Sequence, residues 1–140
     1  MDLKLELVLV PVSDVDRAKA FYIDKAGFNL DVDTSPGGDF RVLQLTPPGS
    51  ACSISIGTGI TKATPGSVEG LHLVVSDIVA TRADLVERGL DVSEIFHFES
   101  GKQAPGPDPQ RSRYNSFANF SDPDGNGWVL QEARRDEPGG

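Results

Sequence analysis

Short apolar runs, separated by polar and glycine-rich stretches, predict a strand, a helix and further strands in the first half of the chain. The nearly continuous apolar run at 3–10 predicts a strand that is buried on much of both faces. Asp14 is a favourable N-cap, and residues 14–26 place apolar side chains at helical spacing before Gly27, a residue type that commonly ends helices. Two or three strands are predicted to follow, at 28–33, 40–45 and 51–56.

An internal repeat organises the chain. The sequence Val-Ser-Asp-Val at 12–15 returns as Val-Ser-Asp-Ile at 75–78, and each copy follows an apolar strand and begins an amphipathic helix. The repeat is about sixty residues long, which is too long for one solenoid unit. It predicts a single pseudo-symmetric α+β domain at 1–134, with modules at 3–57 and 68–132 and a flexible tail at 135–140.

The second copy continues with a strand predicted at 92–98. The polar, proline-rich stretch 99–112 is interpreted as a long surface loop, and such loops are often either functional lids or disordered segments. A final hairpin is predicted from 116–120 and 127–132, joined by the turn sequence Asp-Pro-Asp-Gly at 122–125.

Composition and charge narrow the class of protein. The 140 residues are 38% hydrophobic and 24% charged, which is typical of a globular domain. A net charge of -8 argues against binding to nucleic acid or to an anionic membrane surface. No apolar run approaches the roughly twenty residues of a membrane span, and the amino terminus lacks the basic-then-apolar order of a secretory signal. We therefore expect a cytoplasmic protein with neither nucleic acid nor a membrane as a partner.

The single cysteine limits the redox and metal chemistry that the chain can carry. Cys52 has no second cysteine with which to form an internal disulfide or a cysteine-cluster metal site. No Lys, Arg or His flanks it, so a buried, unreactive thiol is favoured over a nucleophile.

Several short motifs occur in an arrangement known from other proteins. They are the two Val-Ser-Asp helix starts, the Ala-Phe-Tyr at 20–22 followed by Gly27 and Phe28, and the Asp-Pro-Asp-Gly-Asn at 122–126. With these motifs, nearly the whole chain resembles the vicinal oxygen chelate superfamily, which includes glyoxalase I, extradiol dioxygenases, fosfomycin-resistance proteins and bleomycin-binding proteins. The resemblance implies two tandem βαβββ modules, with curved mixed sheets that enclose a cavity and helices on the outer faces. It also implies a homodimer, because relatives commonly pair.

Superfamily members with a catalytic metal carry His or Glu at one inward position on the first and last strand of each module. Aligned by the motifs above, these positions are occupied here by Leu7, Ser53, Gly70 and Val129. A divalent metal ion in such a site needs imidazole or carboxylate ligands, which none of these residues supplies. The resemblance therefore implies the cavity but not the metal, and we expect neither a metal nor another cofactor.

The apolar periodicity gives an independent test of this alignment. Leu71, Leu73 and Val75 are expected to face the helix, which leaves the alternate residues facing the cavity. Strand 51–56 likewise places its isoleucines on the helix side and its serines on the cavity side. A shift by two residues would bring in His72 and Gln131, but the first strand would still offer only a leucine. The predicted lining of the cavity is Leu7, Ser53, Ser55, Gly70, His72, Val129 and Gln131.

His72 is the lining residue best suited to catalysis. Its imidazole could act as a general acid or base or hydrogen-bond a ligand, and the alternative is a histidine held by backbone partners. His97 forms a second local cluster with Glu94 and Glu99, for which an exposed strand end is the favoured interpretation. A metal centre built from His72, His97 and a carboxylate stays open, because the sequence does not fix their separation.

The remaining polar residues have simpler interpretations. Asp14 and Asp77 are predicted to be helix N-caps rather than catalytic acids. Four further side chains could reach a ligand from a strand or loop, although solvated side chains are the favoured interpretation: Arg41, Arg111, Arg113 and Tyr114.

Two functional hypotheses follow. The first is a glyoxalase/bleomycin-resistance-like protein that binds a small, partly apolar organic molecule, such as a drug-like or polyketide-like compound, in a metal-free cavity. The second is a glyoxalase-like lyase or isomerase, or a dioxygenase-type enzyme, that uses His72 as its acid-base group. In both, the partner is a small molecule.

Overall fold

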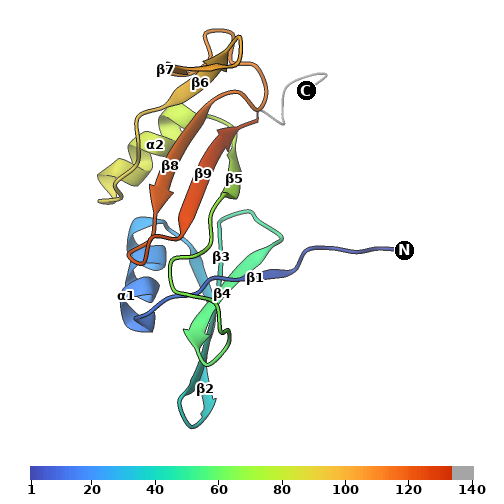
Figure 1. Ribbon diagram of the computed structural model, residues 1–140, viewed down its shortest axis with the longest axis vertical. Helices are drawn as coiled ribbons and strands as arrows, with labels where there is room; N and C mark the ends of the chain where they lie inside the picture. The colour runs from blue at the N-terminus through green and yellow to red at the C-terminus, as the bar shows by residue number, and fades with distance from the viewer. Residues whose placement is uncertain (134–140) are drawn as a thin grey trace. The chain divides into compact units, whose positions relative to one another are not determined.

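The computed structural model of the protein describes residues 1–133, and the chain in it divides into two compact units. The first unit contains residues 1–68 and 122–126, and the second contains residues 69–121 and the chain from residue 127 onward. Each unit contains one sheet and one α-helix (Figure 1). The predicted tail at 135–140 lies outside the described residues. Within residues 1–133, no helix has the length and apolar character needed to cross a membrane.

The first unit follows the predicted order of strand, helix and three strands. Asp14 begins the helix, since its backbone is extended and its side chain accepts a hydrogen bond from the Arg17 N–H at 3.1 Å. Gly27 follows the last helical turn with a φ of 76°, a left-handed conformation that glycine adopts readily. The elements are β1 (Leu7–Leu9), α1 (Val15–Ala20), the π-helical turn η1 (Phe21–Lys25), β2 (Asn29–Gly37), β3 (Phe40–Thr46) and β4 (Ser53–Thr58).

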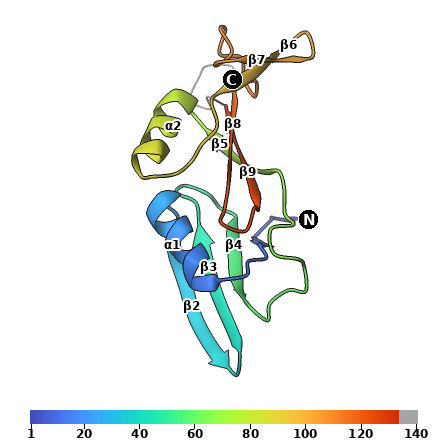
Figure 2. The same ribbon diagram turned by 60° about the vertical axis from the view of Figure 1, so that its left-hand side comes forward.

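The four-stranded sheet of this unit carries its helix on one face. Its strand order is β1-β4-β3-β2, with β1 parallel to β4 and the other neighbours antiparallel. Lys19 of α1 binds Asp33, which is paired with Leu43, so the helix lies on the face that also carries Leu45, Ile54 and Ile56 (Figure 2). These apolar side chains are buried with Ala18 and Tyr22.

The amino-terminal prediction of a strand at 3–10, buried on much of both faces, is wrong. The strand is limited to Leu7–Leu9, and residues 1–6 are exposed. Leu3 and Leu5 are 86% and 70% exposed, and Leu7 and Leu9 are about 40% exposed. All four leucines occupy alternate positions, which in an extended chain point to one side. That side, which for β1 is the sheet face away from α1, is left open by the described residues, and the sequence pattern could not show this.

The second unit repeats the plan of the first. Asp77 begins its helix and accepts hydrogen bonds from the backbone N–H groups of Val79 and Ala80 at 3.1 and 3.2 Å, so both predicted N-caps are confirmed. Gly89, with a φ of 93°, follows the end of that helix. The elements are β5 (Leu71–Val75), α2 (Ile78–Glu87), β6 (Phe96–Glu99), β7 (Lys102–Pro105), β8 (Phe117–Ser121) and β9 (Gly127–Glu132).

The five-stranded sheet has the strand order β5-β9-β8-β6-β7, with β5 parallel to β9 and the other neighbours antiparallel. α2 contacts β8 and β9 (Figure 2). The buried side of these strands includes Trp128, whose ring stacks on Phe120 with centroids 5.9 Å apart. In both units the first strand pairs in parallel with the last, which confirms the predicted α+β fold of two tandem modules.

The stretch 99–112 is not simply a surface loop. Its first half forms β7, which pairs antiparallel with β6 from Phe96↔Pro105 to Glu99↔Lys102. Ser100 and Gly101, with φ values of 50° and 79°, form the tight turn between the two strands. The sequence concealed this edge strand because its residues are polar and include proline, a composition that edge strands tolerate. The preceding strand is also shorter than predicted and begins at Phe96 rather than at residue 92.

The second half of this stretch is ordered around Asp108. Its carboxylate accepts hydrogen bonds from the backbone N–H groups of Gln110 and Ser112 and from the Asn115 side chain, at 3.0, 3.1 and 3.1 Å. These donors, first the Gln110 N–H and then the Asn115 amide, hold the pKa of Asp108 below its usual range. The proline-rich segment is therefore an ordered structure built on one carboxylate.

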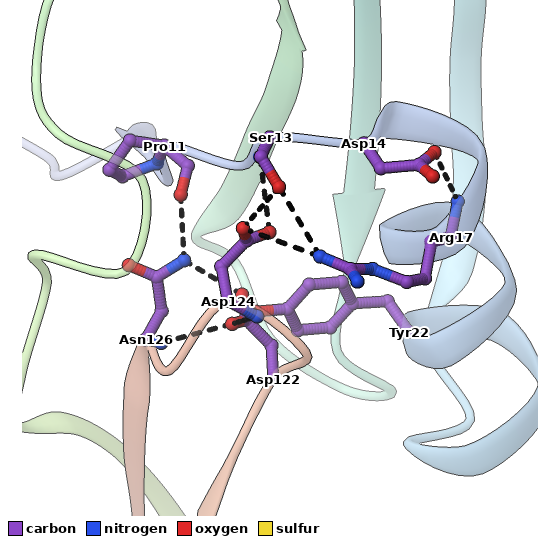
Figure 3. Close-up of polar contacts among 8 residues, drawn as sticks. All are labelled: Pro11, Ser13, Asp14, Arg17, Tyr22, Asp122, Asp124 and Asn126. Carbon is purple, nitrogen blue, oxygen red and sulfur yellow. Dashed lines mark hydrogen bonds and ion pairs between the residues drawn. The ribbon is translucent and has the colours of Figure 1, made fainter.

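The turn at 122–126 joins β8 to β9 and belongs to the first unit. Asp124 accepts hydrogen bonds from the Ser13 hydroxyl at 2.5 Å and from its backbone N–H at 3.1 Å (Figure 3). Asp122 accepts one from the Tyr22 hydroxyl at 2.8 Å, and Asn126 donates to the Pro11 carbonyl at 2.8 Å. This turn, which the sequence alone showed only as a tight connection, is thus tied to the segment from β1 to the end of the helix.

Gly66 lies against the same turn. A Cβ atom at this position would lie 2.1 Å from the Asp124 carbonyl oxygen, and its φ of 82° is left-handed. Because both the space and the backbone conformation exclude other residues, glycine is required here.

Candidate functional site

Three of the predicted lining residues meet on the open face of the four-stranded sheet, which is the face away from α1. Leu7 pairs with Ser53, and Leu9 with Ser55. The two serine hydroxyls are buried and hydrogen-bonded within the sheet, since Ser55 donates to the Leu43 carbonyl at 2.9 Å and Ser53 meets the Thr46 hydroxyl at 2.7 Å. The leucines remain accessible, so this face offers apolar contact next to hydroxyl groups that are already partnered.

The other predicted lining residues lie in the second unit, on the open face of the five-stranded sheet, which is the face away from α2. His72 pairs with Val129, and Val74 with Gln131. Gly70 precedes β5 and is exposed, with a φ of 77°. Leu7 and Ser53, which stand where metal-binding superfamily members carry ligands in the first module, are direct strand partners. In the second unit the strand partner of Val129 is His72, so His72 and not Gly70 is the residue equivalent to Leu7.

His72 is exposed on this face and has a backbone partner. Its Nδ1 atom lies 2.7 Å from the carbonyl oxygen of Gly70. A carbonyl only accepts hydrogen bonds, so Nδ1 carries the hydrogen and Nε2 is the ring atom able to meet a ligand. The backbone contact therefore orients the ring and does not remove its chemistry.

Three phenylalanines that the sequence analysis did not single out extend the same open face. Phe96 pairs with Phe117 across β6 and β8, and their rings stack with centroids 5.5 Å apart. Phe98 meets Phe96 at 6.0 Å and Phe117 at 5.6 Å, each time edge to face. We call Phe96, Phe98 and Phe117 the aromatic cluster. The alternation Phe-His-Phe at 96–98 could have indicated this cluster, because alternate residues of a strand share a face. The apolar periodicity was applied only to strands that carry metal ligands in other superfamily members.

A pocket of about 460 Å³ lies beside the aromatic cluster. The residues that line it include Phe96 of the cluster and three polar residues, Glu94, Gln103 and Asn119. Asn119 pairs with Val129 and so connects the pocket to the predicted lining residues. Its full lining is Ser93, Glu94, Ile95, Phe96, Gln103, Ala104, Pro105 and Asn119.

His97 is buried rather than at an exposed strand end, so that prediction is wrong. Only 3% of its surface is exposed. Nδ1 lies 2.7 Å from the Gly106 carbonyl oxygen and Nε2 lies 2.8 Å from a Glu99 carboxylate oxygen. Of the two predicted carboxylate partners, Glu99 contacts His97, whereas a Glu94 carboxylate oxygen lies 3.6 Å from Arg82 Nη2. One of its partners, Gly106, lies nine residues away, and the sequence could not place it beside His97.

Both ring nitrogens of His97 face acceptors, an arrangement that only the protonated imidazole satisfies. The Glu99 carboxylate, followed by the Gly106 carbonyl, raises the pKa of His97 above its ordinary value, and the charge of Asp108 acts in the same direction. Both ring nitrogens are engaged by these two partners, so His97 links β6 to the segment that follows β7.

Replacing His97 with glutamine is expected to remove a pH-dependent part of the stability. Because the native pKa is raised, the stabilisation is complete below the ordinary histidine pKa of about 6.5 and is lost as the pH rises through the raised native value. Urea unfolding from about pH 5 to 9 should show the difference between wild type and His97→Gln shrinking with rising pH. His72→Gln is the matched control on the exposed histidine. A difference that stayed constant or grew with pH would contradict this assignment.

The superfamily positions do not fit a divalent metal ion. Leu7 and Val129 offer no side-chain donor, and the Ser53 hydroxyl is engaged within the sheet, so His72, the strand partner of Val129, would be the one imidazole or carboxylate among these positions. Within residues 1–133, no three His, Cys, Asp or Glu side chains are grouped as a metal site would require. The centre from His72, His97 and a carboxylate, which the sequence left open, is not formed by these residues.

Of the four polar residues considered as ligand contacts, Arg41 and Arg111 form ion pairs, whereas Arg113 and Tyr114 are exposed. Arg41 binds Asp33 and Asp16 and lines a pocket of about 550 Å³ near the start of α1. Hydrogen bonds from Arg41 and then Lys19 lower the pKa of Asp33 to about 2. Arg111 binds Glu132, and the Arg113 guanidinium lies over the Tyr114 ring at 5.4 Å. The interpretation as solvated side chains is therefore wrong for Arg41 and Arg111 and agrees with the exposure of Arg113 and Tyr114.

Comparison with known proteins agrees with this fold. The family model described as Glyoxalase/Bleomycin resistance protein/Dioxygenase superfamily matches residues 4–130. The structure is similar to that of TnmS3, an antibiotic binding protein from Streptomyces sp. CB03234, at 36% identity and a TM-score of 0.72, with 94% of this chain and 97% of that chain covered.

Two further relatives are a structure and a curated sequence. A glyoxalase/bleomycin resistance protein from Streptomyces sp. CB03234 is 37% identical, with a TM-score of 0.69 and coverage of 91% of this chain and 99% of that one. The uncharacterized protein YetH of Bacillus subtilis (strain 168) is 24% identical over 126 residues, which are 89% of this chain and 94% of YetH. With the family model matching nearly the whole chain, the protein belongs to the Glyoxalase/Bleomycin resistance protein/Dioxygenase superfamily.

Proposed function

We propose that the protein binds a small, partly apolar organic molecule without a metal ion, on the open face of the five-stranded sheet. The observation that carries the proposal is the aromatic cluster on this face. Phe98 is 43% exposed, and Phe96 and Phe117 are half-buried. Exposed aromatic rings that are packed against one another form a platform on which a flat ligand gains both apolar contact and ring stacking.

Polar groups next to the cluster suit the orientation of such a ligand. Ligand sites are typically apolar surfaces with a few polar groups that fix the pose. Here those groups are the amides of Gln103, Asn119 and Gln131 and the Nε2 atom of His72. The likeness to TnmS3, an antibiotic binding protein, supports an antibiotic-like or polyketide-like compound as the ligand class.

Truncation of the cluster tests this proposal. Isothermal titration against 2-naphthol and a panel of aromatic antibiotics is expected to find binding that Phe98→Ala weakens by about 3- to 10-fold, the value of one aromatic pair. Phe40→Ala is the matched control, because Phe40 is 40% exposed but lies in the first unit. Equal losses of affinity in the two variants would refute the site. So would the absence of a measurable heat of binding for every compound of the panel.

An enzymatic role for His72 is the second candidate, and its motivation is the oriented imidazole. In this version the protein is a glyoxalase-like lyase or isomerase in which Nε2 exchanges a proton with a carbonyl-bearing or enolisable substrate. One positioned acid-base group typically contributes about 10²- to 10⁴-fold in rate. His72→Ala should therefore abolish most of any turnover found with α-ketoaldehyde adducts, and a variant that kept full turnover would exclude this role.

We also propose that the protein forms a homodimer. Leu3, Leu5, Leu7 and Leu9 expose one side of the amino-terminal segment to solvent, and contiguous exposed apolar surface often marks a protein interface. Sedimentation velocity should show a dimer in wild type and a larger monomer fraction in a Leu5→Ser and Leu7→Ser double variant. A wild-type monomer at micromolar concentration would contradict the proposal.

A further inference from the structure

The strand ladder between β6 and β8 is a single residue pair, Phe96↔Phe117. Counting two residues further along each antiparallel strand would place Asn115 opposite Phe98. The Asn115 backbone does not continue the ladder, because its N–H donates instead to the Ser112 carbonyl at 3.2 Å. Within residues 1–133, β8 therefore supplies no backbone partner to Phe98.

The Asn115 side chain takes the place of that missing partner. Its Oδ1 atom accepts a hydrogen bond from the Phe98 N–H at 3.1 Å, and its Nδ2 atom donates to the Phe98 carbonyl at 3.0 Å. A residue directly opposite in an antiparallel ladder exchanges the same two kinds of hydrogen bond with its partner. One side-chain amide thus completes the pairing of β6 at Phe98.

The Asp108 carboxylate holds this amide in its orientation. Asn115 Nδ2 also donates to Asp108 Oδ2 at 3.1 Å. Carboxylate and carbonyl oxygens only accept hydrogen bonds and a backbone N–H only donates, so a single orientation of the amide satisfies all three partners. Asp108 is buried and is itself held by the N–H groups of Gln110 and Ser112. The position of Asn115 is therefore set by an anchored carboxylate.

Phe98 is the most exposed ring of the aromatic cluster and has the weaker backbone support. It is 43% exposed, whereas Phe96 and Phe117 are half-buried and pair with each other. On the other side of β6, Phe98 pairs with Gln103 of β7, which is the edge strand of the sheet. A ring that must be ordered when a ligand arrives costs binding free energy. The hydrogen bonds from Asn115 reduce that cost because they hold Phe98 before the ligand binds.

We propose that Asn115 is a positioning residue of the aromatic cluster: its side chain holds the Phe98 backbone so that the exposed ring is placed for a flat ligand. The inference rests on the proposed function, because it concerns the same site. Asn115 does not line the pocket beside the cluster, and it acts through Phe98 rather than by touching the ligand.

Isothermal titration with 2-naphthol at neutral pH tests this assignment. Asn115→Ala is expected to weaken binding by about 3- to 10-fold, as Phe98→Ala does, because a misplaced ring can lose no more than the ring contributes. In a Phe98→Ala background the same substitution should change the affinity by less than about twofold, since the ring on which Asn115 acts is gone. Asn29→Ala, at an exposed asparagine in β2, is the matched control and should bind as wild type does.

Asn115→Asp adds a pH-dependent test with a side chain of nearly the same shape. The introduced carboxyl faces Asp108, and repulsion between two carboxylates raises its pKa. When protonated, at about pH 5, it can accept from the Phe98 N–H and donate one hydrogen bond, whereas at about pH 8 it has no hydrogen to donate. His97 and Glu99, which flank Phe98 on β6, titrate in wild type as well, so each affinity is divided by that of wild type at the same pH. The ratio should approach one at low pH and fall to the value for Asn115→Ala at high pH.

The possible outcomes separate this inference from the proposed function. Equal affinities of wild type and Asn115→Ala would overturn the positioning role and leave the proposed function intact. An undiminished loss in the Phe98→Ala background, or a ratio for Asn115→Asp that does not change with pH, would overturn it in the same way. If Asn115→Ala does not fold, the pH series of Asn115→Asp decides alone. If wild type does not bind 2-naphthol, the proposed function is refuted and this inference with it.

Discussion

Replacing Arg111 with alanine is expected to lower the free energy of unfolding by about 3 kcal/mol, because it removes a two-point ion pair to a buried carboxylate. Arg111 donates from Nε and Nη2 to the two carboxylate oxygens of Glu132, at 3.0 and 2.9 Å. Glu132 is only 1% exposed and also accepts the N–H of Ile78, the first residue of α2, at 2.9 Å. Thermal and urea unfolding measure the loss.

Arg113→Ala is the matched control for this variant. Arg113 lies two residues away, is exposed and rests on the Tyr114 ring, so its removal should cost about 0.5–1 kcal/mol. Adding Glu132→Gln to Arg111→Ala should recover part of the loss, since glutamine can still accept the Ile78 N–H but carries no charge. A cost for Arg111→Ala no greater than that for Arg113→Ala would show that the ion pair does not stabilise the second unit.

Replacing Asp122 with alanine is the second change with a large expected effect, about 3 kcal/mol or more. Its carboxylate accepts four hydrogen bonds, from the Tyr22 hydroxyl, the Asp124 and Asn126 backbone N–H groups and the Asn126 side chain, at 2.8 to 3.0 Å. Tyr22 and Asn126 are completely buried. Each buried donor left without an acceptor costs about 1–3 kcal/mol, so the loss exceeds that of a single hydrogen bond.

Tyr22→Phe separates the contributions at this turn. It removes one of the four donors and should cost about 1.5–3 kcal/mol, less than Asp122→Ala. The exposed Asp39 provides the control, since Asp39→Ala should stay within about 0.5 kcal/mol of wild type. If Asp122→Ala unfolded at the same urea concentration as Asp39→Ala, the turn would not be held by this carboxylate.

The fold could be predicted from the sequence because its signals are local. Asp14 and Asp77 are both N-caps as predicted, since capping depends on residues only two or three positions away. The order of elements followed from the repeat of Val-Ser-Asp and from apolar alternation. These features explain why the tandem α+β architecture was predicted correctly while the length of β1 was not.

The errors have a common physical origin in contacts distant in the sequence. His97 is buried and hydrogen-bonded to Gly106, and β7 exists because it pairs with β6, although its own residues are polar. The amino-terminal leucines look like a buried strand because a leucine at every second position is typical of one, yet no described residues cover them. Apolar alternation shows which residues share a face, but not whether that face is covered.

The candidate site was predicted in part. The motif alignment placed Leu7 and Ser53 on the cavity side, and apolar periodicity placed His72 and Val129 there; the structure pairs Leu7 with Ser53 and His72 with Val129. The aromatic cluster was missed, although the same parity rule applied to β6 and β8 would have placed Phe96, Phe98 and Phe117 on one face.

The most direct test of the proposed function is to map where an aromatic ligand binds. Proton–nitrogen correlation spectra of the full chain are recorded as 2-naphthol is added. The largest shifts should fall on Phe96, Phe98, Phe117 and Asn119, and those that remain in Phe98→Ala should need about 3- to 10-fold more 2-naphthol, whereas Phe40→Ala should behave as wild type. Shifts confined to residues outside the open face of the five-stranded sheet, or no shifts at millimolar 2-naphthol, would contradict an aromatic binding site on this protein.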